Sequence, residues 1–97
     1  MSRGIQRERD VRRVLEAEGW WTARAAGSFG DADVIALKVG TRPQMIEVKS
    51  TTTPFAHFGP ADRAELLDAA ERAGADAYLA YWPKGGKLKF ISPVDWP

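Results

Sequence analysis

The sequence predicts a single α/β domain, residues 1–97, whose central mixed β-sheet is flanked by helices in the order α-β-β-β-α-β-β. Two long stretches carry apolar residues at helical intervals. Five shorter runs are rich in β-branched and aromatic residues and are bounded by glycine, proline or polar residues. With 97 residues and a hydrophobic fraction of 44%, the chain is long enough for one modest core.

The first predicted helix runs from about residue 4 to residue 18 and ends at Gly19. Its apolar residues at helical intervals are Ile5, Val11, Val14 and Leu15. Glu8 interrupts this stripe, so we expect its side chain to project toward the sheet. Two interpretations are open for Glu8: a rim carboxylate paired with Arg12, four residues later, or a functional ligand.

Three strands are expected to follow. Residues 20–24 form the first, and a loop with two glycines covers 25–31. Residues 33–38 and 44–49 then pair as an antiparallel hairpin across a turn at 39–43.

The second predicted helix spans residues 60–73, with a proline in its first turn and Gly74 just beyond its end. We expect it to pack on the sheet through Ala64, Leu67, Ala70 and Ala73. Strands at 77–82 and 88–91 complete the sheet around a glycine-containing turn.

The loop at 50–59 holds the only histidine, His57, which we expect to be a loop residue without a catalytic role; a substrate contact is the alternative. Phe55 and Phe58 could pack in the core, stack on DNA bases or join a dimer interface. Core packing is preferred because it is the simplest way to remove aromatic surface from water.

A carboxylate and an ammonium group stand two residues apart on the third strand. Side chains alternate along a strand, so Glu47 and Lys49 share one face. One interpretation is an edge strand with a solvated polar face, and the other is a binding site. If the hairpin turn is centred near Thr41, Asp33 lies opposite or diagonal to this pair.

Two carboxylates that share a site usually do so because they bind a divalent cation. An all-oxygen ligand set favours magnesium or manganese over zinc. Asp31 competes with Asp33 for this role, since it precedes Asp33 by two residues. We favour Asp33 because the apolar run starts directly after it.

The net charge is +1, but the charges are unevenly distributed. Arginines cluster in the first quarter and lysines near the end, while the second predicted helix is acidic. Such a surface could hold a phosphate backbone on one side, with Arg7 and Arg9 among the contacts; solvated helix faces are the alternative.

Asp33, followed after a turn by Glu47-Val48-Lys49, resembles the PD-(D/E)XK nuclease signature, with Ala32 where that family's proline often stands. More closely, the chain resembles the archaeal-type Holliday junction resolvases. The resemblance covers roughly the first half in register and continues more loosely through the rest. It is carried by Gly4-Ile5-Gln6-Arg7-Glu8-Arg9, Gly19, Arg24-Ala25-Ala26-Gly27-Ser28, Asp33-Val34-Ile35-Ala36 and Glu47-Val48-Lys49.

This resemblance implies a PD-(D/E)XK nuclease-like fold and a role for each matched residue. Asp33 and Glu47 would hold the metal, with the Val48 carbonyl as a further ligand, and Lys49 would orient or activate the attacking water. Glu8 would approach the metal site. Ser28 and Arg24 would contact the scissile phosphate or its neighbours.

The implied activity is a magnesium-dependent endonuclease, with manganese as a substitute, that resolves four-way DNA junctions by paired nicks as a homodimer. Two alternatives are a repair or restriction-like nuclease on other DNA, and a catalytically silent DNA-binding module; a plain protein-interaction domain is a third. The absence of cysteine and of any apolar run near the roughly 20 residues of a membrane span predicts no membrane partner and a cytoplasmic location.

Overall fold

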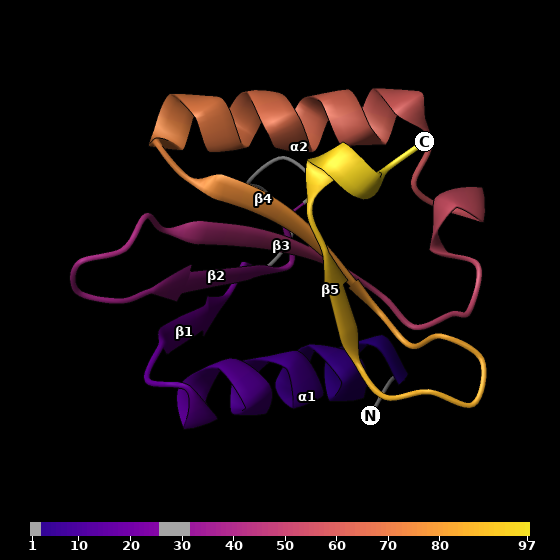
Figure 1. The fold of residues 1–97 in the computed structure, drawn as a ribbon, viewed down its shortest axis with the longest axis horizontal. Helices are drawn as coiled ribbons and strands as arrows, with labels where there is room; N and C mark the ends of the chain where they lie inside the picture. Colours follow the sequence, from indigo (N-terminus) through magenta and orange to yellow (C-terminus); the bar gives the residue numbers. More distant parts are fainter. Residues whose placement is uncertain (1–2, 26–31) are drawn as a thin grey trace.

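The computed structural model describes residues 3–25 and 32–97 of the chain (Figure 1). The element order α-β-β-β-α-β-β is confirmed, with two short 3-10 helices near the second helix and the C-terminus that were not predicted. None of the helices in these ranges is long and apolar enough to span a membrane. The elements are α1 (Arg3–Ala17), β1 (Trp21–Arg24), β2 (Val34–Leu37), β3 (Gln44–Lys49), a 3-10 helix (Pro54–Ala56), α2 (Pro60–Ala73), β4 (Asp76–Tyr81), β5 (Lys89–Ile91) and a second 3-10 helix (Pro93–Asp95).

The five strands form one sheet in the order β1-β2-β3-β4-β5. Strands β3 and β4 are parallel, and the other neighbouring pairs are antiparallel. A parallel pair needs a crossover connection, which here contains α2. The sheet is therefore mixed, as predicted, and β3 is its central strand.

The two helices cover opposite faces of this sheet (Figure 1). On one face, Val11 and Leu15 of α1 are buried against Ile46 of β3. On the other, Leu66 of α2 and Phe58 are fully buried in a second cluster. The sheet thus lies between two apolar layers, and its residues alternate between them.

Each helix buries a narrower stripe than its sequence suggested. In α2, Leu66 is fully buried and Leu67 is 40% exposed, so the prediction of Leu67 as a core residue was wrong. Ala70 is buried as predicted, whereas Ala64 and Ala73 are exposed. In α1, Val14 is likewise 38% exposed. The physical reason is rotation about the helix axis: residues four apart meet the sheet, and a neighbour turned by about 100° does not.

The hairpin turn is centred one residue earlier than the sequence count assumed. Val34 pairs with Ile46 and Ala36 with Gln44, which centres the turn on Gly40. Gly40 has a φ of +81°, a conformation that L-residues with a side chain rarely adopt. The regular pairing ends at Val34 and Ile46, and Asp33 stays beside this end of β3 because its N–H donates to the carbonyl of Ile46.

Candidate active site

Asp33 is attached to the end of β3 by two hydrogen bonds. Its backbone N–H donates to the carbonyl of Ile46 at 2.8 Å, and its Oδ2 accepts from the N–H of Val48, also at 2.8 Å. Because the pairing of β2 with β3 starts at Val34 and Ile46, Val48 lies beyond the ladder. The carboxylate thus takes the place of a strand partner and satisfies a backbone donor that would otherwise lack one.

The Val48 carbonyl lies on the same side of β3 as this carboxylate. In a strand, the N–H and C=O of one residue point in the same lateral direction. The Val48 N–H points at Asp33, so its carbonyl also faces the side that β2 leaves open. Position and chemistry are therefore compatible with the ligand role expected for this carbonyl.

Glu47 is buried, with only 6% of its surface exposed. Lys49 is its charged neighbour on the same face: Nζ lies 3.8 Å from Glu47 Oε1, and the lysine side chain is 26% exposed. A buried carboxylate requires partners. The interpretation of β3 as an edge strand with a solvated polar face was wrong, because the strand is central and the glutamate is inside.

The donor atoms gathered here suit a hard divalent cation. Asp33 offers Oδ1, which has no hydrogen bond to any described residue, and Glu47 and Val48 add a carboxylate and a carbonyl. Magnesium commonly takes one or two protein carboxylates and completes its octahedron with water and phosphate oxygens. Within residues 3–25 and 32–97 there is no cluster of three or more acidic, histidine or cysteine side chains that could hold a metal ion.

Glu8 is bonded to Arg24 rather than to Arg12. Arg24 Nε lies 2.6 Å from Glu8 Oε1, and the glutamate side chain is 15% exposed. Arg12 instead donates to the hydroxyl of Thr22 at 3.0 Å. The expected inward position of Glu8 is confirmed in part, but its partner comes from β1. Its predicted approach to the metal stays a prediction.

The loop that precedes Asp33 holds two residues singled out by the sequence. Ser28, expected to contact the scissile phosphate, lies outside the described residues, and so does Asp31, the competing carboxylate. Asp33 has the geometry expected of the site carboxylate, since its side chain is fixed against the strand that carries Glu47 and Lys49.

The family model of the archaeal Holliday junction resolvases (Hjc) matches residues 1–96. The chain belongs to this family. The crossover junction endodeoxyribonuclease Hjc of Methanocaldococcus jannaschii is 33% identical over 91 residues, which cover 94% of this chain and 66% of the relative. The chain thus spans slightly less than two thirds of that relative's length.

A solved structure supports the same assignment. Archaeoglobus fulgidus Hjc, described as a Holliday junction resolvase from an archaeal hyperthermophile, superposes with a TM-score of 0.78 at 27% identity. The match covers 94% of this chain and 73% of that one. The mixed sheet and its two helices are therefore the resolvase fold.

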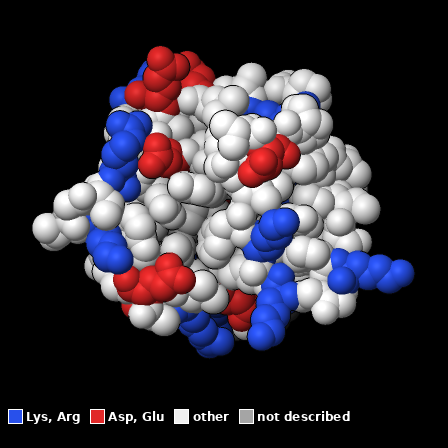
Figure 2. All heavy atoms as spheres, in the orientation of Figure 1, with Lys and Arg blue, Asp and Glu red and all other residues white. Residues whose placement is uncertain are grey.

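In this member of the resolvase family, the predicted DNA contacts lie on or near α1. Arg9 borders a small hollow of about 200 Å³ with Arg12, Arg13 and Glu16. Arg7 lies over the ring of Trp82, with 4.3 Å between the guanidinium carbon and the ring centroid. Figure 2 shows basic side chains interspersed with acidic ones on one face, including blue groups along its lower edge, over α1. Both signs of charge are present there, so the face is not uniformly basic.

The aromatic residues of the 50–59 loop differ in role. Phe58 is fully buried and meets Trp96 edge to face, with 5.2 Å between ring centroids. The core interpretation is confirmed for Phe58. Phe55 is half-buried against it, with centroids 6.4 Å apart. His57 is exposed, and its backbone N–H donates to Pro54.

Sequence reasoning missed the residues that follow the two parallel strands. Ser50 and Thr51 come directly after Lys49, and Trp82 comes directly after β4. The parallel register pairs Lys49 with Tyr81, so these segments leave the sheet side by side. The available signal was position: parallel neighbours bring their carboxyl ends together, where sites often form.

Proposed function

We propose that this chain is a metal-dependent endonuclease that resolves four-way DNA junctions by paired, symmetric nicks. The observation that carries the proposal is the Asp33 carboxylate held against the end of β3, where Glu47 and Lys49 share one face. Its membership of the resolvase family supports the junction as the substrate.

We assign each site residue a role that is compatible with its position. Asp33 and Glu47 hold a magnesium ion, or manganese in its place, and the Val48 carbonyl adds a third oxygen. When bound, the ion polarises a phosphoryl oxygen and lowers the pKa of a coordinated water. Lys49 orients that water through Nζ and neutralises charge on the phosphate, while Glu47 fixes the ammonium group beside the site.

The remaining predicted residues act around this centre. Glu8 and Arg24 form a pair whose arginine is 45% exposed and can contact a phosphate. Arg7 and Arg9 contact the DNA backbone, and Ser28 contacts the scissile phosphate. The partner is branched DNA in the cytoplasm. Two copies of the chain act as a homodimer, because the two opposite strands must be cut symmetrically.

Asp33→Asn and Glu47→Gln test the site directly. Each should abolish cleavage of a synthetic four-way junction in magnesium and in manganese, because each removes one anionic ligand. Junction binding, measured by gel shift in calcium, should persist. Asp68→Asn is the matched control, since Asp68 is an exposed acid on α2 and its loss should not change the cleavage rate.

The outcomes separate the alternatives. Normal cutting by either variant would refute the site assignment. Cutting of linear duplex or flaps as fast as the junction would instead indicate a repair or restriction-like nuclease. Junction binding by the wild-type chain without cleavage in either metal would identify a silent binding module, and no DNA binding at all would indicate a protein-interaction domain.

A further inference from the structure

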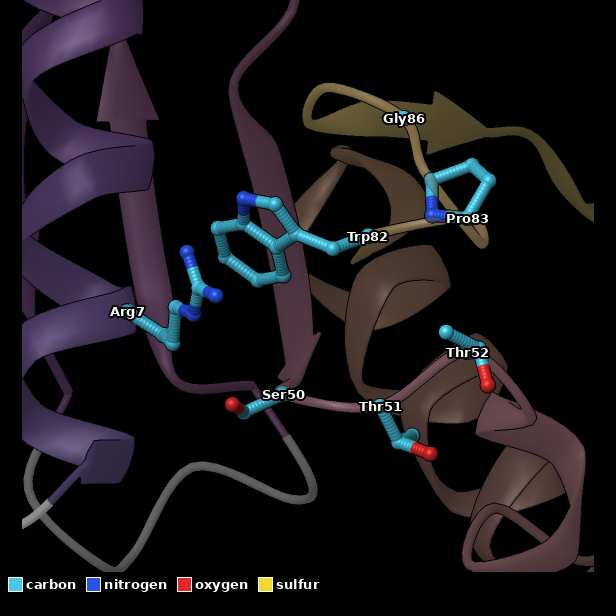
Figure 3. A pocket seen from close by; sticks show the side chains of 7 residues that line it. All are labelled: Arg7, Ser50, Thr51, Thr52, Trp82, Pro83 and Gly86. Atoms are coloured by element: carbon cyan, nitrogen blue, oxygen red, sulfur yellow. The ribbon is translucent and has the colours of Figure 1, made fainter.

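A cavity of about 440 Å³ lies beyond the C-terminal end of β3 (Figure 3). Its walls come from three places: α1, the turn that follows β3, and the segment between β4 and β5. The lining residues include Arg7, Ser50, Thr51, Thr52, Trp82 and Gly86. Ser50 directly follows Lys49 in the chain, so the cavity begins at the end of β3 where the proposed cleavage site lies.

Arg7 offers hydrogen-bond donors to this cavity. Its guanidinium lies over Trp82, as Figure 3 shows, at 4.3 Å from the ring centroid. Its nearest carboxylate is Asp10, at 3.6 Å from Nη1, which is too long for a hydrogen bond. Asp10 also accepts from Gln6 at 3.1 Å. The guanidinium is therefore held by the indole and by the ion pair with Asp10, and it makes no hydrogen bond to any described residue.

Ser50 provides the second observation. Its hydroxyl oxygen is buried and has no hydrogen-bond partner among the described residues, yet the residue lines the cavity. A buried hydroxyl without a partner is unfavourable, and native structures rarely retain one without a reason. A ligand in the cavity would supply the missing partner.

The neighbouring hydroxyl, that of Thr51, has a proton that it can donate. Thr51 Oγ1 accepts from the N–H of Thr53 at 3.1 Å, so its own proton can point elsewhere. Thr53 Oγ1 lies 3.3 Å from Thr51 Oγ1, and either hydroxyl can be the donor in this contact. Thr51 can therefore donate a hydrogen bond to a group inside the cavity without losing the turn.

The side chains that line the cavity favour an anion over a cation. The lining contains one arginine and three hydroxyl side chains, and no acidic residue occurs among the described residues that line it. Arginine and hydroxyl donors together bind phosphate oxygens well. A cavity of about 440 Å³ can hold a phosphate together with its sugar.

We propose that this cavity binds a phosphate group next to the scissile one on the cleaved DNA strand. Arg7, Ser50 and Thr51 are its ligands, and Trp82 is a positioning residue that holds the guanidinium. The inference rests on the proposed function for its place on the cut strand. The phosphate recognition itself follows from the cavity.

Nuclear magnetic resonance tests the cavity without any junction or cleavage. Titration of the ¹⁵N-labelled full chain with the tetranucleotide dT4 should shift the Trp82 indole N–H and the Ser50 and Thr51 amides. Inorganic phosphate should shift the same amides at higher concentration. In Arg7→Ala these shifts should be lost, whereas Arg72→Ala, which removes an exposed arginine on α2, should retain them. Unshifted cavity signals in the wild-type chain would overturn the subsite.

The salt dependence of junction binding gives a second readout. In Arg7→Ala, the slope of log K against log salt should fall by about 1, because one phosphate contact is lost. Affinity should fall about tenfold, as expected for one charged hydrogen-bonded contact. An unchanged slope, with junction binding otherwise normal, would overturn the subsite and leave the proposed function standing.

Trp82 needs a test that separates positioning from folding. Trp82→Phe keeps an aromatic face under the guanidinium and should keep most of the affinity, whereas Trp82→Ala should match the loss seen in Arg7→Ala. Equal losses for both Trp82 variants would refute the positioning role. If dT4 shifts the cavity signals but the wild-type chain neither binds nor cuts a junction, the proposed function fails and the subsite stands.

Discussion

A single carboxylate, that of Asp33, links the fold to the proposed chemistry. One oxygen accepts a hydrogen bond from the Val48 backbone, and this bond holds the side chain beside β3. The other oxygen is directed by the same bond and can bind a cation. Asp33 is held at the same end of β3 as the buried Glu47, and we expect a divalent cation to offset any repulsion between the two carboxylates.

Substitutions at Asp33 should separate these two effects. Asp33→Ala loses a hydrogen bond of roughly 1.5–3 kcal/mol but also relieves repulsion, so we expect a net loss of about 1–2 kcal/mol. Asp33→Asn keeps an acceptor for the Val48 N–H and should be close to wild type in the free energy of unfolding. Urea unfolding in EDTA measures both. An equal loss of unfolding free energy in the two variants would show that the hydrogen bond between Asp33 and the Val48 N–H does not account for the effect.

Glu8 illustrates how a residue's partner depends on packing. Its i+4 neighbour Arg12 bonds to Thr22, while Arg24 of β1 reaches Glu8 instead. Both contacts join α1 to the edge strand. They fix the helix against β1 and place an exposed arginine near the end of the sheet that carries the site.

At the scale of elements, α2 is held by one line of contacts on the sheet. Leu66→Ala should cost about 2–5 kcal/mol because it leaves a cavity in a fully buried position. Leu67→Ala should cost less than about 1 kcal/mol because that side chain is 40% exposed. Thermal or urea unfolding of the two variants compares them directly. A larger loss at Leu67 would mean that the helix is rotated relative to the structure.

The end of α2 depends on a residue without a side chain. Gly74 has a φ of +66° and donates its N–H to the carbonyls of Ala70 and Glu71. Nothing lies within 4 Å of an added Cβ, so Gly74→Ala should cost only the backbone strain, about 1–2 kcal/mol.

Gly59, at the other end of α2, is the matched control. Its φ is −76°, and an added Cβ there also meets nothing within 4 Å. Gly59→Ala weakens the N-cap, which is destabilising, but it also makes the unfolded chain less flexible, which is stabilising. Because these effects oppose each other, the free energy of unfolding should change by less than about 0.5 kcal/mol. Equal losses in both glycine variants, measured by urea unfolding, would contradict the backbone explanation.

At the scale of the molecule, one chain presents one candidate site. Paired nicks on opposite strands therefore require two chains related by a twofold axis. Sedimentation should give twice the 10.7 kDa mass of the chain. Wild-type chains mixed with Glu47→Gln chains should convert a cruciform plasmid mainly to nicked circles, while wild type alone makes it linear. A monomeric mass with full linearisation would contradict the dimer.

Much of the candidate site could be predicted because it is local. Asp33 and Glu47 belong to one hairpin, and the alternation of side chains along a strand places Glu47 and Lys49 together. The predicted centre of the turn was wrong by one residue, but the prediction still placed Asp33 next to Glu47 and Lys49. The order of helices and strands could be predicted for the same reason. The apolar periodicity that indicates each element, and the glycine and proline residues that bound it, involve residues only a few positions apart.

The sequence alone determined the element order and the Asp33, Glu47 and Lys49 group, because short-range geometry brings them together. Only the tertiary structure decided that Glu8 pairs with Arg24, that Leu66 rather than Leu67 meets the sheet, and that Arg7 lies over Trp82. Arg7 and Trp82 are far apart in the chain, and their contact depends on how α1 lies across the sheet. Periodicity identifies an apolar face only to within a fraction of a turn, and packing sets the final rotation of each helix.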